Sequence, residues 1–328
     1  MRIPRTREDL AALGYIAGWR FVGLLPHRLV RWAADRAADR FSAGGRGPAQ
    51  LRRNLARVVG CPPEEVPDAL VRASMRSYLR YWVEAFRLPT MLGPDLVEKA
   101  GAHFDEGSDV FEEAHASGRG MVMVLTHSGN WDMAGMWLVN RVGGFTTVAE
   151  RLRPEELYDA FVGFREGLGF TVLPLTGGEP PMEGLRARLR DGGIVCLLGE
   201  RDLGGRGVEV DFFGERTTMP VGAAQLARET GASLHVIHVF FVGDDGWGMK
   251  VGPEIPVADR PLADVVQEQA RQMEADIARH PADWHMLQPL WLADRRDRRC
   301  DSGSGDARDD GSRAARGGDA QCPSAEGE

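Results

Sequence analysis

The feature of this chain that most constrains its fold is a regular alternation of short apolar runs with helical patterns, which begins near Gly118. Each run is six or seven residues long, and a segment with helical periodicity separates it from the next run. Parallel strands need a long crossover between them, so this order predicts an α/β fold with a mostly parallel sheet flanked by helices. The expected strands cover residues 120–126, 145–150, 170–175 and 194–200.

The segments around these strands complete the expected core with covering helices, a hairpin and a closing helix. The hairpin is predicted because two apolar runs flank the turn sequence Gly-Asp-Asp-Gly. Pro220 in the first turn and Gly231 at the end delimit the last covering helix. In chain order we expect helices over 131–140, 154–167 and 182–193, an irregular strand and turn over 208–220, a helix over 220–231, a hairpin of 233–242 with 247–255, and a closing helix over 261–281.

Three regions of different character divide the chain. Residues 1–117 are expected to be helical, with the clearest patterns over 8–42 and 69–88. Residues 118–294 contain the α/β core. Residues 295–328 are rich in Gly, Ser, Asp and Arg and poor in large apolar side chains, a composition that predicts a disordered tail.

The net charge of −8 argues against a nucleic-acid-binding protein, yet the charge is unevenly distributed. Residues 1–60 contain 12 Arg, no Lys and 4 acidic residues, which gives this segment a charge of +8. Its most apolar stretch, residues 10–26, is interrupted by Arg20 and is shorter than the roughly 20 apolar residues that a spanning helix needs. Taken alone, the N-terminal helices either lie at an anionic membrane surface or pack on the domain as ordinary amphipathic helices.

The four cysteines, Cys61, Cys196, Cys300 and Cys322, are scattered without the spacing of a disulfide framework or a metal site. This usage is typical of a reducing compartment. Acidic side chains precede any apolar segment at the start of the chain, so no secretory signal is expected. We expect a soluble or peripheral protein.

Ionisable side chains stand directly after three of the expected strands. His127 follows the first strand, Glu150 ends the second, and Glu200 ends the fourth. In open α/β sheets, ligands bind at the carboxyl ends of the strands. These three groups are therefore expected at one edge of the sheet, near a common site.

A histidine at such a site can accept a proton from a hydroxyl group when a carboxylate or carbonyl holds its other ring nitrogen. Asp132 and Glu200 are the candidates to hold His127, one close in sequence and one distant. Asp132 could instead cap the helix that begins there, as could Asn130, because the Gly129-Asn130 pair permits a tight turn.

The other candidate sites have weaker support. His235 and His238 lie in a β-branched run and are expected to be core or sheet-surface residues. A metal site that joins them to His127 and the carboxylates is supported poorly by the spacing. The chain has neither a G-x-S-x-G elbow nor a Walker-type phosphate loop, which argues against the hydrolases and NTPases that use those motifs.

Longer stretches resemble the bacterial lipid A lauroyl-type acyltransferases, within the lysophospholipid acyltransferase superfamily. Among these, the chain is most similar to the actinobacterial phosphatidylinositol mannoside acyltransferases. The resemblance runs from about Leu10 to Trp291. The H-x4-D motif is short, but it occurs together with FFGE, a Pro-Val-Gly-Ala-Ala helix and a W-H-x-L-Q-P-L-W ending. The stretches that carry the resemblance are HSGNWD (127–132), VAERLRPEELYDAFVGFREGLGFTVLPL (148–175), LLGERDLGGRGVEVDFFGERTTMPVGAAQLARETGA (197–232) and HPADWHMLQPLW (280–291).

The resemblance implies a glycerol-phosphate-acyltransferase-like fold and a reaction. In that reaction a fatty acyl chain, palmitoyl in particular, moves from coenzyme A to the 6-hydroxyl of a mannose on phosphatidylinositol mannoside. Acyl-coenzyme A is a co-substrate, and neither a metal nor another cofactor is required, because a thioester is already activated. His127 would act as the general base, with Glu200 and Asp132 orienting its imidazole.

The resemblance also implies substrate-binding residues and a location. Glu150 and Arg165 match polar positions that the family uses at its active site. Arg165 and Arg201 could bind the phosphates of coenzyme A or of the lipid, since guanidinium groups pair with phosphate oxygens; the alternative for either is a structural ion pair. A water-insoluble acceptor favours interfacial N-terminal helices and a peripheral protein on the cytoplasmic face of the plasma membrane, where acyl-coenzyme A is available.

Three alternatives to this function stay open. The acceptor could be another glycolipid or a lysophospholipid. A lipid or thioester hydrolase could use the same histidine and carboxylate with water in place of the sugar. A lipid-binding protein could hold His127 in a polar network that carries out no reaction.

Overall fold

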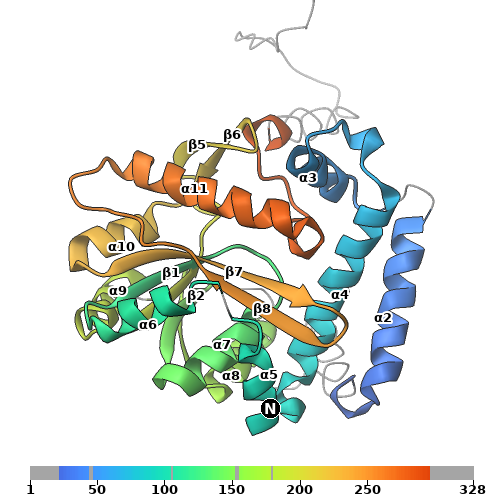
Figure 1. Cartoon of the computed structure of the whole chain (residues 1–328), viewed down its shortest axis with the longest axis horizontal. Coiled ribbons are helices and arrows are strands. Elements are labelled where there is room, and N and C mark those ends of the chain that lie inside the picture. The colour runs from blue at the N-terminus through green and yellow to red at the C-terminus, as the bar shows by residue number, and fades with distance from the viewer. Residues whose placement is uncertain (1–21, 44–46, 105, 152–154, 179, 296–328) are drawn as a thin grey trace, which may run out of the picture.

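A six-stranded sheet forms the centre of the computed structural model, which describes residues 22–43, 47–104, 106–151, 155–178 and 180–295 (Figure 1). The strand order is β3-β2-β4-β1-β7-β8, and every neighbouring pair is parallel except β7 with β8. The prediction of an α/β fold with a mostly parallel sheet is therefore confirmed. The strands are β1 (Met121–Leu125), β2 (Phe145–Ala149), β3 (Phe170–Pro174), β4 (Ile194–Leu198), β7 (Ser233–Val242) and β8 (Gly246–Val251).

The strand order matters for the site because it places β4 next to β1. The chain leaves β1, runs outward through β2 and β3, and returns through β4 into the gap between β2 and β1. It then crosses to the other side of β1 through β7. Loops that leave β1, β2 and β4 thus emerge side by side at one edge, where open α/β sheets bind their ligands.

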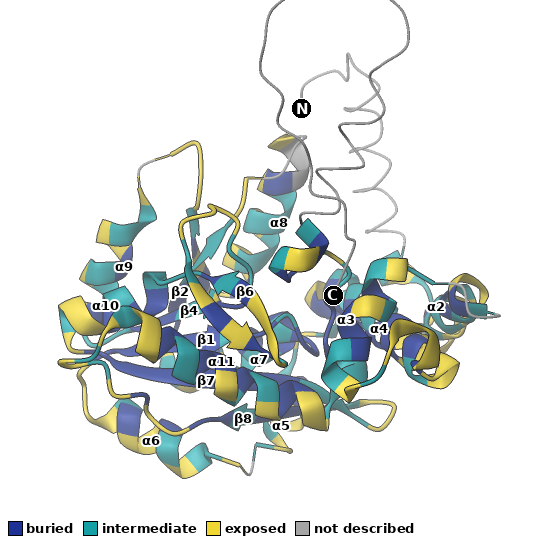
Figure 2. Cartoon of the chain, turned by 90° about the horizontal axis from the view of Figure 1, so that it is seen from above, coloured by how far each residue is buried: buried dark blue, intermediate teal, exposed yellow. Residues whose placement is uncertain are grey.

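Alternate residues of β1 face two separate hydrophobic clusters. Val122 and Val124 pack in the cluster that includes α9, α10 and α11, while Met121 and Met123 pack in the cluster that includes α5, α6 and α7. Strands β1 and β7 are buried over most of their length, and exposed residues lie mainly on the outer faces of the helices (Figure 2). Both faces of the sheet are therefore covered, as near-continuous apolar strands require.

Helices follow the strands as the periodicity predicts. The C-terminal end of α10 has Gly231 in the left-handed conformation, with φ of 74°, as expected for a glycine cap. The helices around the sheet are α5 (Pro94–Gly101), α6 (Ser108–Ala116), α7 (Trp131–Val142), α8 (Glu155–Gly167), α9 (Pro181–Arg190), α10 (Gly222–Thr230) and α11 (Leu262–Arg279), with a short 3-10 turn η3 (Pro281–Asp283) after the last.

The segment expected to be an irregular strand and turn is a regular two-stranded ribbon. Strands β5 (Val208–Phe212) and β6 (Glu215–Met219) pair antiparallel outside the main sheet. Phe213 and Gly214 join them with φ values of 49° and 76°. Positive φ at both central residues is typical of a tight hairpin turn whose twist matches that of the strands. Glycine favours this geometry, whereas a phenylalanine in the sequence does not predict it.

The helices before the sheet form a layer along one side of the molecule. α2 (His27–Ser42) lies along α4 (Asp68–Met91), and α3 (Ala49–Val59) packs beside them (Figure 1). Their shared core includes Ala38 and Leu55. The short turn η2 (Pro63–Glu65) joins α3 to α4. The apolar core continues across residue 118, because Leu88 and Phe111 pack in the same cluster as the strands.

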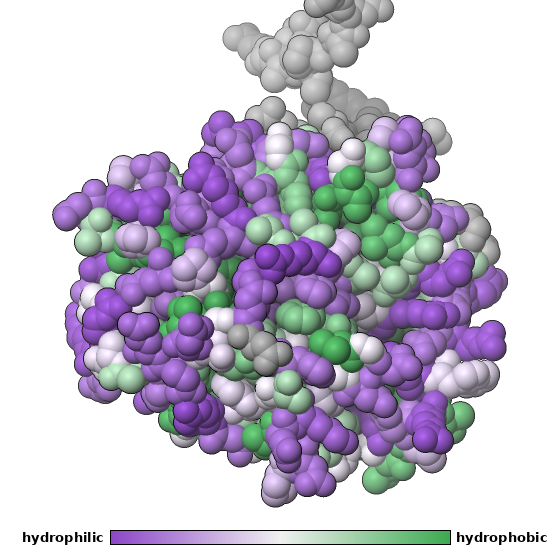
Figure 3. Space-filling view, in the orientation of Figure 1, coloured by the Kyte–Doolittle hydropathy of each residue, from purple (hydrophilic) through white to green (hydrophobic). Residues whose placement is uncertain are grey.

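Two sequence predictions lie outside the described residues: the helix over residues 8–21 and the disordered tail from residue 296 onward. Within the described ranges, no helix combines the length and hydrophobicity needed to cross a bilayer. Hydrophilic residues cover most of the face seen in Figure 3.

Candidate active site

His127 stands in a short loop between β1 and α7. The loop turns sharply at Gly129, where φ is 54°. A Cβ atom at Gly129 would lie 2.7 Å from the carbonyl carbon and oxygen of Val239 on β7, so only glycine fits there. The close approach brings the His127 loop against the sheet edge and fixes its path.

Glu200 holds the His127 ring. The Glu200 carboxylate is completely buried at the end of β4, the strand beside β1. Its Oε1 atom accepts hydrogen bonds from the backbone N–H of His127 at 2.5 Å and from His127 Nδ1 at 2.8 Å. Because a carboxylate only accepts, the proton resides on Nδ1, and Nε2 is left as an acceptor.

The electrostatics of this pair favour an ionised carboxylate. Burial alone raises the pKa of Glu200, but electrostatic attraction to the His127 ring and the hydrogen bonds that His127 donates outweigh it and bring that pKa below its ordinary value. The His127 side chain is 21% exposed, whereas Glu200 is inaccessible to solvent. The imidazole can therefore meet a ligand while its negative partner stays shielded behind it.

The expectation that Asp132 orients the His127 imidazole is wrong in this structure, because the hydrogen bonds of the Asp132 carboxylate go to other residues. The buried Asp132 carboxylate accepts from Arg165 Nε at 2.8 Å and from the Tyr81 hydroxyl at 3.0 Å. The physical reason is helix geometry: Asp132 lies in the first turn of α7, whose inner side faces α4 and α8. Asp132 does not cap α7 either, because Asn130 Oδ1 accepts from the Met133 N–H at 3.0 Å.

Arg165 is thus in an ion pair, the alternative that the sequence had left open. Its side chain is 19% exposed and lies on α8. Burial lowers the pKa of the Arg165 guanidinium, but the Asp132 carboxylate more than compensates and raises it. Burial and the neighbouring Asp132 charge raise the pKa of Tyr81 well above its ordinary value, so its hydroxyl remains a donor.

Glu150 and Arg201 also lie at this edge of the sheet. Glu150 directly follows β2 and is exposed, and both residues line the same cavity as His127. Arg201 follows Glu200, and its guanidinium donates to the side-chain oxygen of Gln288. His127 and Glu200, which follow β1 and β4, are thus in direct contact, and Glu150, which follows β2, lines the same cavity as His127.

A C-terminal segment closes the back of the site. The His285 N–H donates to the His127 carbonyl at 2.7 Å, and the Gly129 N–H donates to the Asp283 carbonyl at 2.9 Å. His285 Nε2 lies 2.9 Å from Ser77 Oγ. Burial, and secondarily the nearby His127, lower the pKa of His285 to about 3, so its ring is neutral.

Sequence reasoning missed Tyr81 and His285 as residues of the site. Tyr81 belongs to an aromatic stripe on α4 that has the spacing of ordinary core. His285 belongs to the W-H-x-L-Q-P-L-W ending, which follows no strand. One signal was available: both polar groups occur inside otherwise apolar stretches, and a polar group that is buried there needs a hydrogen-bond partner.

A cavity of about 1050 Å³ opens beside His127. Its walls are mostly apolar, and they continue from the His127 loop beneath α7 and along the sheet. Aromatic and aliphatic side chains from the second hydrophobic cluster line this inner part, among them Phe111, Met123, Leu138, Phe145, Phe170 and Cys196.

The candidate metal site is not formed by the described residues. Within them, no group of three or more His, Cys, Asp and Glu side chains could hold a metal ion. His235 Nδ1 lies 3.0 Å from the Gly252 carbonyl, and the His238 ring stacks on Phe240. Both histidines are buried in β7, as expected for core residues.

The geometry defines a class of protein: an α/β enzyme-like site in which a histidine, held by a buried carboxylate, opens onto a long apolar cavity. Such a site can remove a proton from a hydroxyl group beside a bound hydrocarbon chain. Comparison with known proteins gives the family. Residues 4–293 match the family model described as bacterial lipid A biosynthesis acyltransferase, and the chain belongs to that family.

Curated relatives agree with this assignment. The chain is 54% identical over 304 residues to a protein of Mycolicibacterium smegmatis named phosphatidylinositol mannoside acyltransferase, covering 91% of this chain and 96% of the relative. It is 55% identical over 293 residues to a protein of the same name from Mycobacterium tuberculosis strain H37Rv, covering 89% and 91%. The resemblance seen in the sequence motifs is therefore confirmed.

Proposed function

We propose that this protein transfers a palmitoyl-type acyl chain from coenzyme A to the 6-hydroxyl of a mannose on phosphatidylinositol mannoside. The observation that carries the proposal is the pairing of His127 with buried Glu200 at the mouth of an apolar cavity. The names of the two relatives support the acceptor. The donor, the hydroxyl position and the role of the base are our inference.

In the proposed reaction, His127 Nε2 accepts the proton of the mannose hydroxyl as its oxygen attacks the thioester carbonyl. The C–S bond then breaks, the acyl group stays on the sugar oxygen, and the imidazolium returns its proton to the departing thiolate. Such positioned general-base help is worth about 10²–10⁴-fold in rate. Glu200 holds the required tautomer and stabilises the imidazolium while it exists.

The inner cavity is the proposed site of the acyl chain. It extends from the His127 loop among apolar side chains, where each buried CH₂ group of a ligand contributes about 0.8 kcal/mol. The same walls keep water away from the thioester, which favours transfer over hydrolysis. This one cavity is sufficient for the single acyl chain that the reaction transfers.

The polar rim is the proposed site of the sugar and phosphates. Glu150 is exposed at the cavity and can accept hydrogen bonds from mannose hydroxyls. Arg201 can pair with a phosphate of coenzyme A or of the lipid, since a guanidinium donates two parallel hydrogen bonds. Arg165 is engaged with Asp132, so we assign it chiefly to holding the rim in shape and secondarily to contacting the acceptor.

We also propose that the protein works as a peripheral protein at the cytoplasmic face of the plasma membrane. The outward side of α2 exposes Leu29 and Trp32, which are 50% and 58% exposed. Arg28, Arg36 and Arg40 are exposed on the same helix. Apolar residues flanked by arginines suit a helix that lies in an anionic lipid surface.

The products of the reaction test the function. We would incubate the wild-type protein with radiolabelled palmitoyl-coenzyme A, with and without purified phosphatidylinositol mannoside, and locate the new ester by NMR. Labelled glycolipid esterified at the mannose 6-hydroxyl is the expected result. Labelled free fatty acid formed equally without the glycolipid would instead establish a hydrolase. Transfer to a lysophospholipid, with none to phosphatidylinositol mannoside, would show that the acceptor is the lysophospholipid.

Vesicle sedimentation tests the location. Binding to vesicles that contain anionic lipid is expected to exceed binding to neutral vesicles and to weaken with salt. Trp32→Glu should reduce it, whereas Val59→Glu on α3 serves as a control at another exposed apolar residue. Equal binding of both variants and wild type would contradict the proposed role of α2.

A further inference from the structure

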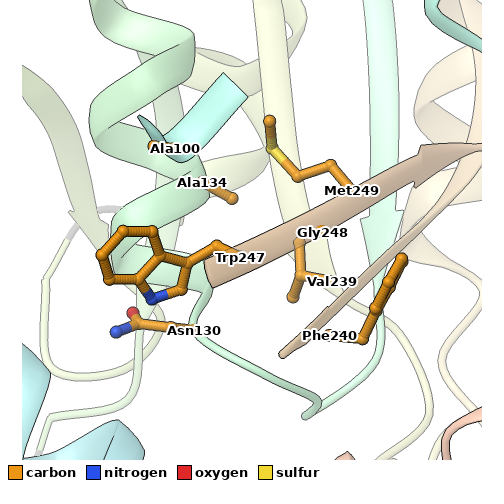
Figure 4. Close-up of a pocket in the computed structure, with 8 residues that line it drawn as sticks. All are labelled: Ala100, Asn130, Ala134, Val239, Phe240, Trp247, Gly248 and Met249. Atoms are coloured by element: carbon orange, nitrogen blue, oxygen red, sulfur yellow. The ribbon is translucent and has the colours of Figure 1, made fainter. Parts of the chain in front are cut away.

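A buried polar network lies behind the His127 loop and takes no part in the proposed chemistry. Arg80 and Glu84 on α4 are each 3% exposed, and Arg80 Nε donates to Glu84 Oε1 at 2.6 Å. Glu84 Oε2 accepts from Asn130 Nδ2 at 2.8 Å and from Trp247 Nε1 at 2.7 Å. Figure 4 shows the Trp247 indole on β8 beside the Asn130 side chain at the start of α7.

Every group bound to Glu84 can only donate in this arrangement. Arg80 and Trp247 have no acceptor atom in the side-chain groups concerned, and Asn130 turns its amide nitrogen toward Glu84. Arg80 is held in turn by the carbonyls of Gly243 and Gly246 at 2.8 and 3.0 Å. The network is therefore specific for a carboxylate at position 84, because a glutamine would direct a donor at a donor.

Asn130 connects this network to the active site. While its Nδ2 donates to Glu84, its Oδ1 accepts from the Met133 N–H and caps α7. Asn130 lies between His127, which contacts Glu200, and Asp132, which binds Tyr81. Tyr81 and Glu84 are about one turn apart on α4, so a single face of this helix binds both Asp132 and Asn130 in the short segment that follows His127.

We infer that Glu84 is a positioning residue that fixes the His127 loop through Asn130. It touches no substrate, and it acts by keeping Asn130, and with it the backbone of residues 127–130, in the one arrangement that presents His127 to both Glu200 and the cavity. Its effect on the reaction rests on the proposed function. Its effect on the loop does not, and the two can be measured separately.

Asn130→Ser isolates the contact with Glu84. Serine is a good N-cap and retains the bond to the Met133 N–H, but it cannot donate as Asn130 Nδ2 does. Trp247→Phe is the matched control, because it removes another buried hydrogen bond to the same Glu84 oxygen and leaves the bond to Asn130 in place. Glu84→Gln provides a third variant, in which the amide oxygen can keep the bonds at one carboxylate position while the amide nitrogen faces a donor at the other.

Hydrogen exchange of residues 126–133 and the steady-state constants form the test. We expect Asn130→Ser to speed exchange of this segment and to lower kcat by at least about tenfold, with KM for palmitoyl-coenzyme A within about twofold of wild type, since small displacements of a reacting group cost up to about 10²-fold. Trp247→Phe should change neither the exchange of this segment nor kcat appreciably.

Other results would overturn the inference. If Asn130→Ser leaves the exchange of residues 126–133 at the wild-type rate, Glu84 does not position the loop. If Trp247→Phe lowers kcat as much as Asn130→Ser does, the network is merely structural. If exchange rises while kcat stays unchanged, the loop position does not govern the reaction. If wild type transfers no acyl group, the proposed function fails, while the exchange data still decide whether Glu84 holds the loop.

Discussion

His127 Nδ1 and Glu200 Oε1 lie 2.8 Å apart, although 73 residues separate them in the sequence. The adjacency of β1 and β4 produces this contact, because the loops that follow two neighbouring parallel strands emerge at the same edge. Glu200 binds the backbone N–H of His127 as well as its ring. The carboxylate therefore fixes both the position of the loop and the tautomer of the imidazole.

Glu200→Gln should remove the charge from this pair with little change in volume. The glutamine can present its amide nitrogen to His127 Nδ1, which would favour the wrong tautomer, and it no longer stabilises an imidazolium. We expect kcat to fall about 10²–10⁴-fold with a small change in KM. The control is Glu254→Gln, at an exposed residue paired with Arg119. Activity within a few-fold of wild type in Glu200→Gln would show that the charge is dispensable.

Asp132→Asn should act on stability as well as activity. The change leaves the guanidinium of Arg165, which is largely buried, without its counter-charge, and breaking such a pair costs about 3–5 kcal/mol in free energy of unfolding. Urea titration measures this cost. Glu112→Gln breaks the exposed pair with Arg141 and should cost less than about 1 kcal/mol. Equal losses in the two variants would contradict the structural importance that we assign to Asp132.

Cys196→Phe should shorten the acyl chain that the protein prefers. Cys196 lies on β4 with its side chain at the cavity, and the larger ring would occupy space proposed for the hydrocarbon. Excluding two CH₂ groups loses about 1.6 kcal/mol, so kcat/KM for palmitoyl-coenzyme A relative to a shorter donor should fall about tenfold. Cys196→Ala is the size control. An unchanged donor preference in Cys196→Phe would place the acyl chain elsewhere.

His238 should make folding sensitive to acid. Burial lowers the pKa of His238 from 6.5 to about 3, helped by the positive charges of His280, Lys250 and Arg279, and neither ring nitrogen has a hydrogen-bond partner among the described residues. Between pH 6.5 and 3 the unfolded state binds a proton that the folded state does not, so stability falls as the pH falls through this window. At pH 5 the loss from this group is about 2 kcal/mol relative to neutral pH.

His238→Leu should therefore flatten the acid side of the stability curve. The unfolding free energy, measured in urea at pH 7.5 and at pH 5, should differ by about 2 kcal/mol less in the variant than in wild type. His285 contributes in the same direction and remains in both proteins. A pH dependence identical to that of wild type would mean that His238 is protonated, or hydrated, in the folded state.

Much of the fold follows from local patterns in the sequence. The strands of the main sheet and the helices between them have apolar periodicities that long-range contacts reinforce, so their predicted limits agree closely with β1 to β4 and α7 to α11. The ribbon of β5 and β6 was predicted only as an irregular segment. Strand β5 does alternate, with Val210 and Phe212 buried, but β6 is mostly polar, and the turn between them places Phe213 at positive φ, which no propensity predicts.

The residues of the candidate site could be predicted only where an ionisable side chain directly follows a predicted strand. His127, Glu150 and Glu200 met that condition. The partner of His127 could not be chosen from spacing, because Asp132 is nearer in sequence but turns toward Arg165 and Tyr81 once α7 forms. Tyr81 and His285 come from elements far from the strand ends, and only tertiary packing brings them to the site.

The measurement that tests the central claim most directly is acyl transfer by His127→Ala. The variant would be compared with wild type in transfer from palmitoyl-coenzyme A to phosphatidylinositol mannoside, with the two proteins matched in far-ultraviolet circular dichroism and in unfolding midpoint. The account predicts that the folded variant loses about 10²–10⁴-fold in kcat. Transfer by folded His127→Ala at a rate near that of wild type would contradict it.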